Sequence, residues 1–145
     1  MKPLVVAIAA IVLTLGSLTG ASAQESELSA GDREQIQSVI DRQIDAFRRD
    51  DGPAAYEFAA PSIKRIFPSV TRFMSMVQQG YAPVYRPQTY TFDDLRMTDR
   101  GPVQAVRIVG PNNGSWVALY TFQQQPDGTW KISGVYLQRA PGTTT

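Results

Sequence analysis

The stretch "DRQIDAFRRDDGPAAYEFAAP", residues 41–61, decides how the N-terminal half folds, because it joins two segments with helical spacing. Just before and within it, apolar residues recur at the intervals of one helix face. They are Ile36, Val39, Ile40, Ile44 and Phe47. The spacing predicts a helix over about 32–49, with Ser29 or Asp32 as its cap.

Two adjacent aspartates, Asp50 and Asp51, stand where that helix must end. Pro53 suits the first turn of a second helix, and Asp51 or Gly52 suits its cap. The alternative is a catalytic pair, but residues adjacent in sequence rarely share a face. The sequence therefore favours helix-end roles for both aspartates over catalytic ones.

Gln43 interrupts the apolar stripe of the first helix, seven residues after Ile36 and four before Phe47. One interpretation is a buried amide bonded to backbone, which is the usual state of such groups. The other is a polar group that faces a cavity. The sequence favours the first interpretation and leaves the second open.

The next segments are short and bounded by prolines. Pro61 ends a helix expected over 54–60, "SIKRIF" at 62–67 is expected to form a short turn, and 69–80 reads as a further helix. "YAPVYRP" at 81–87 is predicted to be extended, because each proline biases the residue before it away from helix.

From Gln88 onward the period changes from helical to alternating, which predicts four strands. Their expected ranges are 89–97, 103–109, 115–123 and 130–138. Alternation slips at Asp93–Asp94, between Ala105 and Val106, and at Gly134, and such slips are typical of bulges that bend a sheet. We therefore expect an α+β fold with N-terminal helices packed into the concave side of a strongly curved, four-stranded antiparallel sheet.

The first 23 residues, with a basic start, an apolar run and a final "ASA", are typical of a secretory signal peptide cleaved after Ala23. The apolar run is shorter than a membrane-spanning helix needs, which disfavours an uncleaved anchor. Residues 24–31 are expected to be a flexible leader, 32–138 a single domain, and 139–145 a disordered tail. We expect an exported protein, periplasmic or extracellular, with no stable membrane span after cleavage.

Composition excludes several kinds of chemistry. The chain has no cysteine and no histidine, which removes disulfides, serine–histidine catalysis and the usual zinc or haem sites. We therefore expect no cofactor and no metal. Without Lys2 the remaining 13 basic residues balance 13 acidic ones, so a nucleic-acid partner is not expected.

Four segments carry a resemblance to known proteins: "QIDAFRRDD", "AYEFAAPSIKRIF", "FMSMVQQGYAPVYRP" and "PDGTWKISGVYL". The chain is similar to a family of short exported bacterial proteins, domain of unknown function family 4864. Helices followed by a bent meander also resemble the nuclear transport factor 2-like (cystatin-like) α+β cone. That resemblance implies either enzymes with an aspartate base and a tyrosine, or proteins that only bind ligands or pair as dimers, and fold alone does not choose.

Two functions are consistent with these observations. The first is a non-catalytic module that binds a small apolar ligand or a protein partner, with a homodimer through the outer sheet face as one form of partnership. Its candidate ligand-binding residues are Gln43, Tyr81, Tyr85, Tyr90, Trp116 and Tyr120. The alternative is a small isomerase- or hydrolase-like enzyme, which needs a buried carboxylate and a phenol. Its acid–base candidates are Asp50, Asp51 and Asp94.

Overall fold

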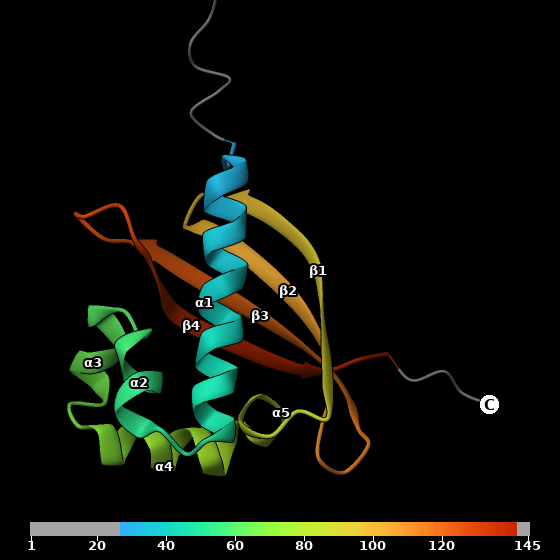
Figure 1. The fold of residues 1–145 in the computed structure, drawn as a ribbon. Helices are drawn as coiled ribbons and strands as arrows, with labels where there is room; N and C mark the ends of the chain where they lie inside the picture. Colours follow the sequence, from blue (N-terminus) through green and yellow to red (C-terminus); the bar gives the residue numbers. More distant parts are fainter. Residues whose placement is uncertain (1–26, 142–145) are drawn as a thin grey trace, which may run out of the picture.

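The computed structural model describes residues 27–141, so the predicted signal peptide and its cleavage site at Ala23 lie outside the described residues. Helices come first and strands follow (Figure 1). The helices are α1 (Ala30–Arg48), α2 (Gly52–Glu57), α3 (Pro61–Ile66), α4 (Val70–Gly80) and α5 (Ala82–Tyr85). The strands are β1 (Thr89–Thr98), β2 (Gly101–Val109), β3 (Ser115–Gln124) and β4 (Trp130–Arg139). The chain therefore has the expected α+β order.

The long helix α1 lies across one face of the sheet (Figure 1). Its start is a capping box: the Ser29 hydroxyl accepts a hydrogen bond from the Asp32 N–H, and the Asp32 carboxylate accepts from Ser29. Because Ser29 is the cap, α1 begins two residues before the predicted start. Leu28 is buried in the core, so the end of the predicted flexible leader is part of the fold.

The two adjacent aspartates end one helix and begin the next. Asp50 has a φ of 54° and its N–H donates to the Phe47 carbonyl, while the Asp51 N–H donates to Ala46. These two bonds form a Schellman motif, in which a left-handed residue closes the helix. The Asp51 side chain then accepts a hydrogen bond from the Ala54 N–H and caps α2. Asp51 therefore has the capping role that the sequence predicts.

Prolines begin the short helices rather than only ending them. Pro61 stands in the first turn of α3, where its missing N–H costs nothing. Pro83 does the same in α5, so the prediction that 81–87 is extended was wrong. The two residues that flank α5, Tyr81 and Arg86, leave the helical region, and Arg86 stands directly before Pro87.

The strands form one antiparallel sheet in the order β1-β2-β3-β4. Register shifts occur at Asp93–Asp94 in β1 and at Ser133 in β4, near two of the three predicted slips. The register of β2 with β3 is unbroken, so the slip predicted inside β2 was wrong. The sequence suggested a slip because Val103 and Ala105 are apolar although they lie on the outer face of β2. The polar Gln104 between them is the residue that is buried.

The sheet is not strongly curled, which corrects the prediction of a strongly curved cone. Both bulges lie in the edge strands β1 and β4. A bulge bends the strand that carries it, so the regular central pair keeps the sheet open.

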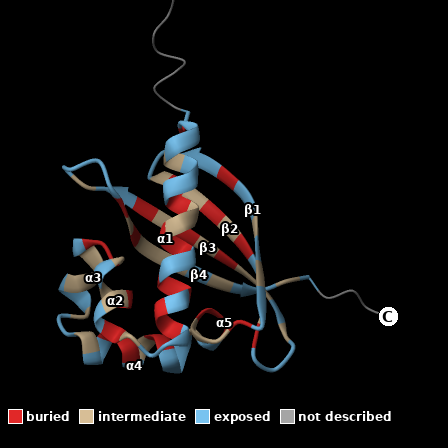
Figure 2. Cartoon of the chain, in the orientation of Figure 1, coloured by how far each residue is buried: buried red, intermediate tan, exposed pale blue. Residues whose placement is uncertain are grey.

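The two faces of the sheet differ in burial (Figure 2). The helices cover the inner face, where β3 buries Ala118, Tyr120 and Phe122, as alternation predicts. On the outer face Val117 and Leu119 are only half-buried. The core therefore lies between α1 and the inner face.

Candidate functional site

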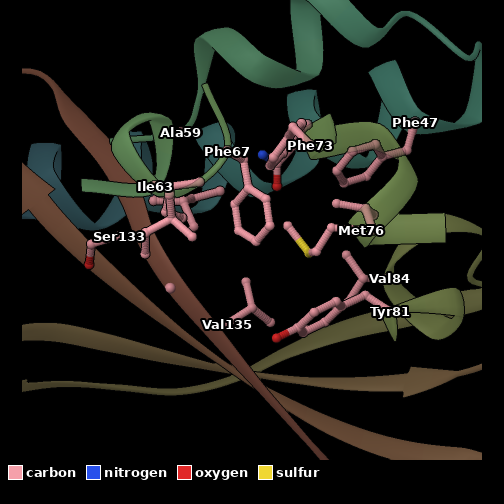
Figure 3. A pocket seen from close by; sticks show the side chains of 15 residues that line it. Phe47, Ala59, Ile63, Phe67, Phe73, Met76, Tyr81, Val84, Ser133 and Val135 are labelled. Atoms are coloured by element: carbon pink, nitrogen blue, oxygen red, sulfur yellow. The ribbon is translucent and has the colours of Figure 1, made fainter. Parts of the chain in front are cut away.

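An apolar pocket with a volume of about 290 Å³ lies between the short helices and β4 (Figure 3). Phe67, Phe73 and Met76 project into it from the helical side, and Val135 projects from β4. None of the residues that line it is charged. The pocket therefore presents an apolar surface to whatever enters it.

The pocket reaches the protein surface beside α3. Ile66 lines the pocket and is 69 % exposed, which is unusual for a large aliphatic side chain. Helices of four to eleven residues, separated by tight turns, form most of the walls. Such short segments do not interlock as completely as a long helix on a sheet, and an open space remains.

Gln43 is both a buried amide bonded to backbone and a polar group that faces a cavity, so both interpretations of the sequence apply. Its side chain is 3 % exposed, and its Nε2 donates to the Ala55 carbonyl at 3.1 Å. The residue also lines the pocket, and no described residue donates a hydrogen bond to its Oε1. Gln43 therefore brings an acceptor to an otherwise apolar wall.

Tyr81 is the only other predicted ligand-binding residue that lines this pocket. It stands at the junction of α4 and α5, where its N–H donates to Val77 and its carbonyl accepts from Val84. Its ring lies on the pocket side of that junction, opposite Val135 (Figure 3). The sequence placed Tyr81 in an extended segment, whereas a turn between two helices positions it.

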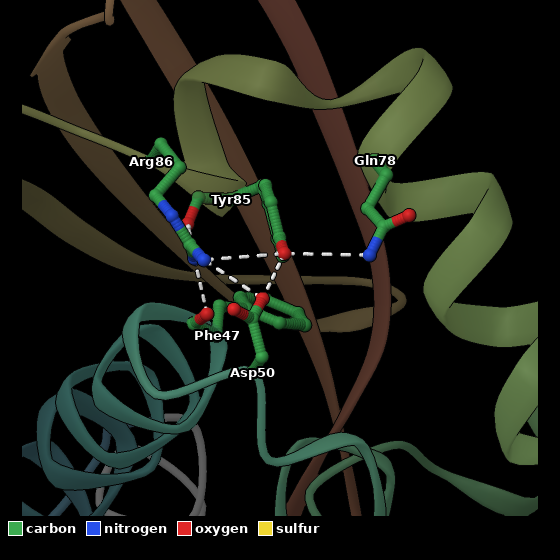
Figure 4. A network of polar contacts seen from close by, with 5 residues as sticks. All are labelled: Phe47, Asp50, Gln78, Tyr85 and Arg86. Atoms are coloured by element: carbon green, nitrogen blue, oxygen red, sulfur yellow. Dashed lines mark hydrogen bonds and ion pairs between the residues drawn. The ribbon is translucent and has the colours of Figure 1, made fainter.

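Tyr85 belongs to a polar network outside the pocket (Figure 4). Its hydroxyl donates to the Asp50 carboxylate, and Arg86 bonds the same carboxylate at 2.7 Å. Arg86 also donates to the Phe47 carbonyl, so it places a cation at the end of α1. The hydrogen bond from Tyr85, followed by that from Arg86, lowers the pKa of Asp50. The network ties α5 to α1 and keeps Asp50 ionised.

The remaining aromatic candidates lie elsewhere. The Tyr90 hydroxyl donates to Asp41 at 2.7 Å, and burial together with that carboxylate raises the pKa of Tyr90 to about 12. Trp116 lies against the guanidinium of Arg139, 4.7 Å from the ring centre. Tyr120 is fully buried, and its hydroxyl has no hydrogen-bond partner among the described residues. The structure therefore does not bring these three together with Gln43 and Tyr81.

The acid–base candidates are also dispersed. Asp94 is exposed and paired with Arg96, and Asp93 is exposed and paired with Arg107. Asp50 is exposed within the network above, and Asp51 is the cap of α2. None of these carboxylates lines the apolar pocket.

Sequence reasoning missed most of the pocket wall and one buried amide. Ile63, Phe67 and Met76 have helical spacing, but nothing in the sequence separates a pocket lining from core. Gln104 is fully buried and donates to the Asp93 and Asp94 carbonyls, so its amide fills the β1 bulge. The break in alternation at Asp93–Asp94 indicated the bulge, but nothing in the sequence indicated that Gln104 forms hydrogen bonds with it.

Two further properties concern the described residues alone. Within 27–141, no helix is both long and apolar enough to cross a bilayer. The same residues bring no three potential ligands of the histidine, cysteine, aspartate and glutamate types together at a metal site.

Comparison with known proteins identifies one family. No curated protein and no solved structure is significantly similar to the chain. A family model described as domain of unknown function (DUF4864) matches residues 29–145, which is most of the chain and all of the fold described above. The chain therefore belongs to the DUF4864 family.

Proposed function

We propose that this protein is a non-catalytic module that binds a small apolar ligand in the pocket between the short helices and β4. The observation that carries the proposal is an open pocket whose lining residues are all uncharged. Ligand sites are usually of this kind, with apolar walls and a few polar groups that orient the ligand. Here Gln43 and Tyr81 supply those groups.

The size of the pocket sets the size of the ligand. An apolar cavity of roughly 150 Å³ accepts benzene, so about 290 Å³ suits a molecule of about ten to twelve heavy atoms. A single alkyl chain or a bicyclic ring system has these dimensions.

An enzymatic function is less well supported by the same geometry. Acid–base chemistry needs a carboxylate within hydrogen-bond reach of the substrate. The carboxylates of Asp50, Asp93 and Asp94 are exposed and paired with arginines outside the pocket. This arrangement favours binding over catalysis.

The proposal also includes the superfamily of the fold, the export of the protein and a surface for a homodimer. The order of helices followed by an antiparallel meander supports a place in the nuclear transport factor 2-like superfamily, although the open sheet departs from a closed cone. Residues 1–23 support export to the periplasm or the exterior. The outer sheet face, where Tyr136 is 65 % exposed, offers a surface for a homodimer.

The test is the binding of a neutral probe, 1-decanol, to the purified chain by calorimetry. Val135→Phe places a larger side chain in the pocket, and Val117→Phe makes the same change on the outer face of the same sheet. We expect saturable binding that Val135→Phe weakens about tenfold and Val117→Phe leaves within about twofold. No saturable binding, or equal effects of the two variants, would overturn the proposal.

A further inference from the structure

We infer that the ligand of this pocket is an amphiphilic anion, a single-chain carboxylate of about ten carbons, whose headgroup is attracted by the basic side chains of α3 and α4. The inference rests on the proposed function, because it assigns a ligand class to the same pocket. It is carried by the distribution of charge around the pocket.

Three of the helices that wall the pocket, α3, α4 and α5, belong to a segment without acidic residues. Between Phe58 and Phe92 the sequence has no aspartate and no glutamate. The same segment contains four basic residues, Lys64, Arg65, Arg72 and Arg86, whereas the whole chain has a net charge of only +1. This segment, which contains α3, α4 and α5, is therefore basic within a nearly neutral chain.

Three of these four cations have no acidic partner in the described structure. Arg86 is paired with Asp50, but none of the ion pairs within residues 27–141 includes Lys64, Arg65 or Arg72. Lys64 lies over the Tyr56 ring at 4.9 Å, and the two arginines are exposed. Unpaired cations that share one side of a molecule add their fields and attract anions.

The cations stand on the same helices as the pocket lining. In α3, Lys64 and Arg65 stand between Ile63 and Ile66 in the sequence. The two isoleucines line the pocket, and the two basic side chains leave the same helix turn in other directions. In α4, Arg72 lies one turn before Met76, so the two side chains are neighbours on the helix surface. In Figure 3 the side chains of Ile63 and Met76 lie at the cavity, on its α3 and α4 sides.

This combination of surfaces matches a molecule with two unlike ends. The uncharged lining suits an alkyl chain, and the exposed Ile66 marks where apolar wall and solvent meet. A carboxylate held at that rim stays hydrated and gains charge-assisted hydrogen bonds from long basic side chains. A cationic headgroup at the same place meets like charges and no carboxylate on α3, α4 or α5.

The experiment compares two ligands that differ in the sign of the headgroup. Decanoate and decyltrimethylammonium carry chains of the same length, and both are titrated below their micellar concentrations at low salt. We expect the parent chain to bind decanoate about tenfold more tightly than the cation. Because exposed charges are screened, about 1 M NaCl should remove most of this preference.

A matched pair of double variants tests the assignment to these residues. Arg65→Gln/Arg72→Gln removes two exposed arginines on helices that wall the pocket, and Arg42→Gln/Arg100→Gln removes two exposed arginines outside the 58–92 segment. We expect the first variant to reduce the preference to about threefold or less and the second to retain it. All three proteins should bind 1-decanol equally, because the apolar lining is unchanged.

The outcomes separate the two proposals. If 1-decanol binds but the two ions bind equally, the anionic headgroup is wrong. If both double variants keep the preference, the assignment of the headgroup to the basic side chains of α3 and α4 is wrong. In both cases the apolar pocket stands. If 1-decanol does not bind, both proposals fail. If free decanoate shows no preference while phosphatidylglycerol vesicles bind the parent and not Arg65→Gln/Arg72→Gln, the basic helices face a membrane and the inference is overturned.

Discussion

The two halves of this domain fill their interiors differently. Where α1 crosses the sheet, the interior is closed, and Ile36, Ile40 and Ile44 are fully buried. Where the short helices α3 to α5 and the C-terminal part of α1 meet β4, an open pocket remains. We call the closed part, where α1 crosses the sheet, the dry half, and the part with the pocket the hollow half. The two differ in the length of the segments that pack together, which are long in the dry half and short in the hollow half.

The dry half is closed because two long, regular surfaces meet. α1 has 19 residues and presents one apolar stripe, and the inner sheet face repeats every second residue. Its buried amide, Gln104, bonds to the β1 bulge and to Gln37. The Tyr120 hydroxyl, also buried in this half, has no hydrogen-bond partner among the described residues.

The largest expected effect compares one isoleucine from each half. Ile40→Ala removes a fully buried side chain from the dry half and should cost about 2–5 kcal/mol of unfolding free energy. Ile63→Ala enlarges a pocket that already reaches solvent, so we expect a cost of about 1 kcal/mol. Urea unfolding followed by tryptophan fluorescence measures both. Equal losses would mean that the pocket is as tightly packed as the core.

A smaller effect concerns the buried amide of Gln104, which bonds to the β1 bulge. Gln104→Leu replaces the amide with an apolar side chain of similar size and so removes the donor to the Asp93 and Asp94 carbonyls. Leaving these bulge carbonyls without donors should cost about 1–3 kcal/mol.

The control for that variant is Gln138→Leu, an exposed position near the end of β4, where we expect a change within about 0.5 kcal/mol. Urea midpoints of the two variants, taken with the slopes of their transitions, give both values. A Gln104→Leu protein as stable as its parent would show that the bulge carbonyls do not need that amide.

The predictable part of the fold is the part with long repeats. The bounds of α1 and of all four strands fall within about two residues of the prediction, because each has enough residues to show its period. Ser29 and Asp51 were each one of two predicted cap residues, chosen by residue type and position alone. These signals are local, and a sequence carries them directly.

The hollow half was harder to predict because its structure depends on distant contacts. Pro83 reads equally well as a breaker and as the first turn of a helix, and only the packing of α5 decides. The bonds from Tyr85 and Arg86 to Asp50 join residues 35 and 36 positions apart. Gln43 was visible as a polar break in an apolar stripe, but the wall around it was not.

The smallest expected effect concerns the hydrogen bond between Trp130 and Asp32 at the N-terminal end of α1. The Trp130 indole N–H donates to Asp32 at 3.0 Å, and this bond, followed by the one from the Ser29 hydroxyl, lowers the pKa of Asp32 below 3.8. A lowered pKa means that the carboxylate stabilises the fold above about pH 4 and that this contribution is lost as the pH falls further.

Asp32→Asn keeps an oxygen acceptor for the indole but removes the charge, so we expect a loss below about 1 kcal/mol at neutral pH. The difference in unfolding free energy between parent and variant should stay constant above about pH 5 and shrink towards zero below about pH 3. The control Asp99→Asn, in the exposed turn between β1 and β2, should show no such trend. If the Asp32→Asn difference does not change with pH, the bond from Trp130 holds the first turn of α1 through its geometry and not through the charge of the carboxylate.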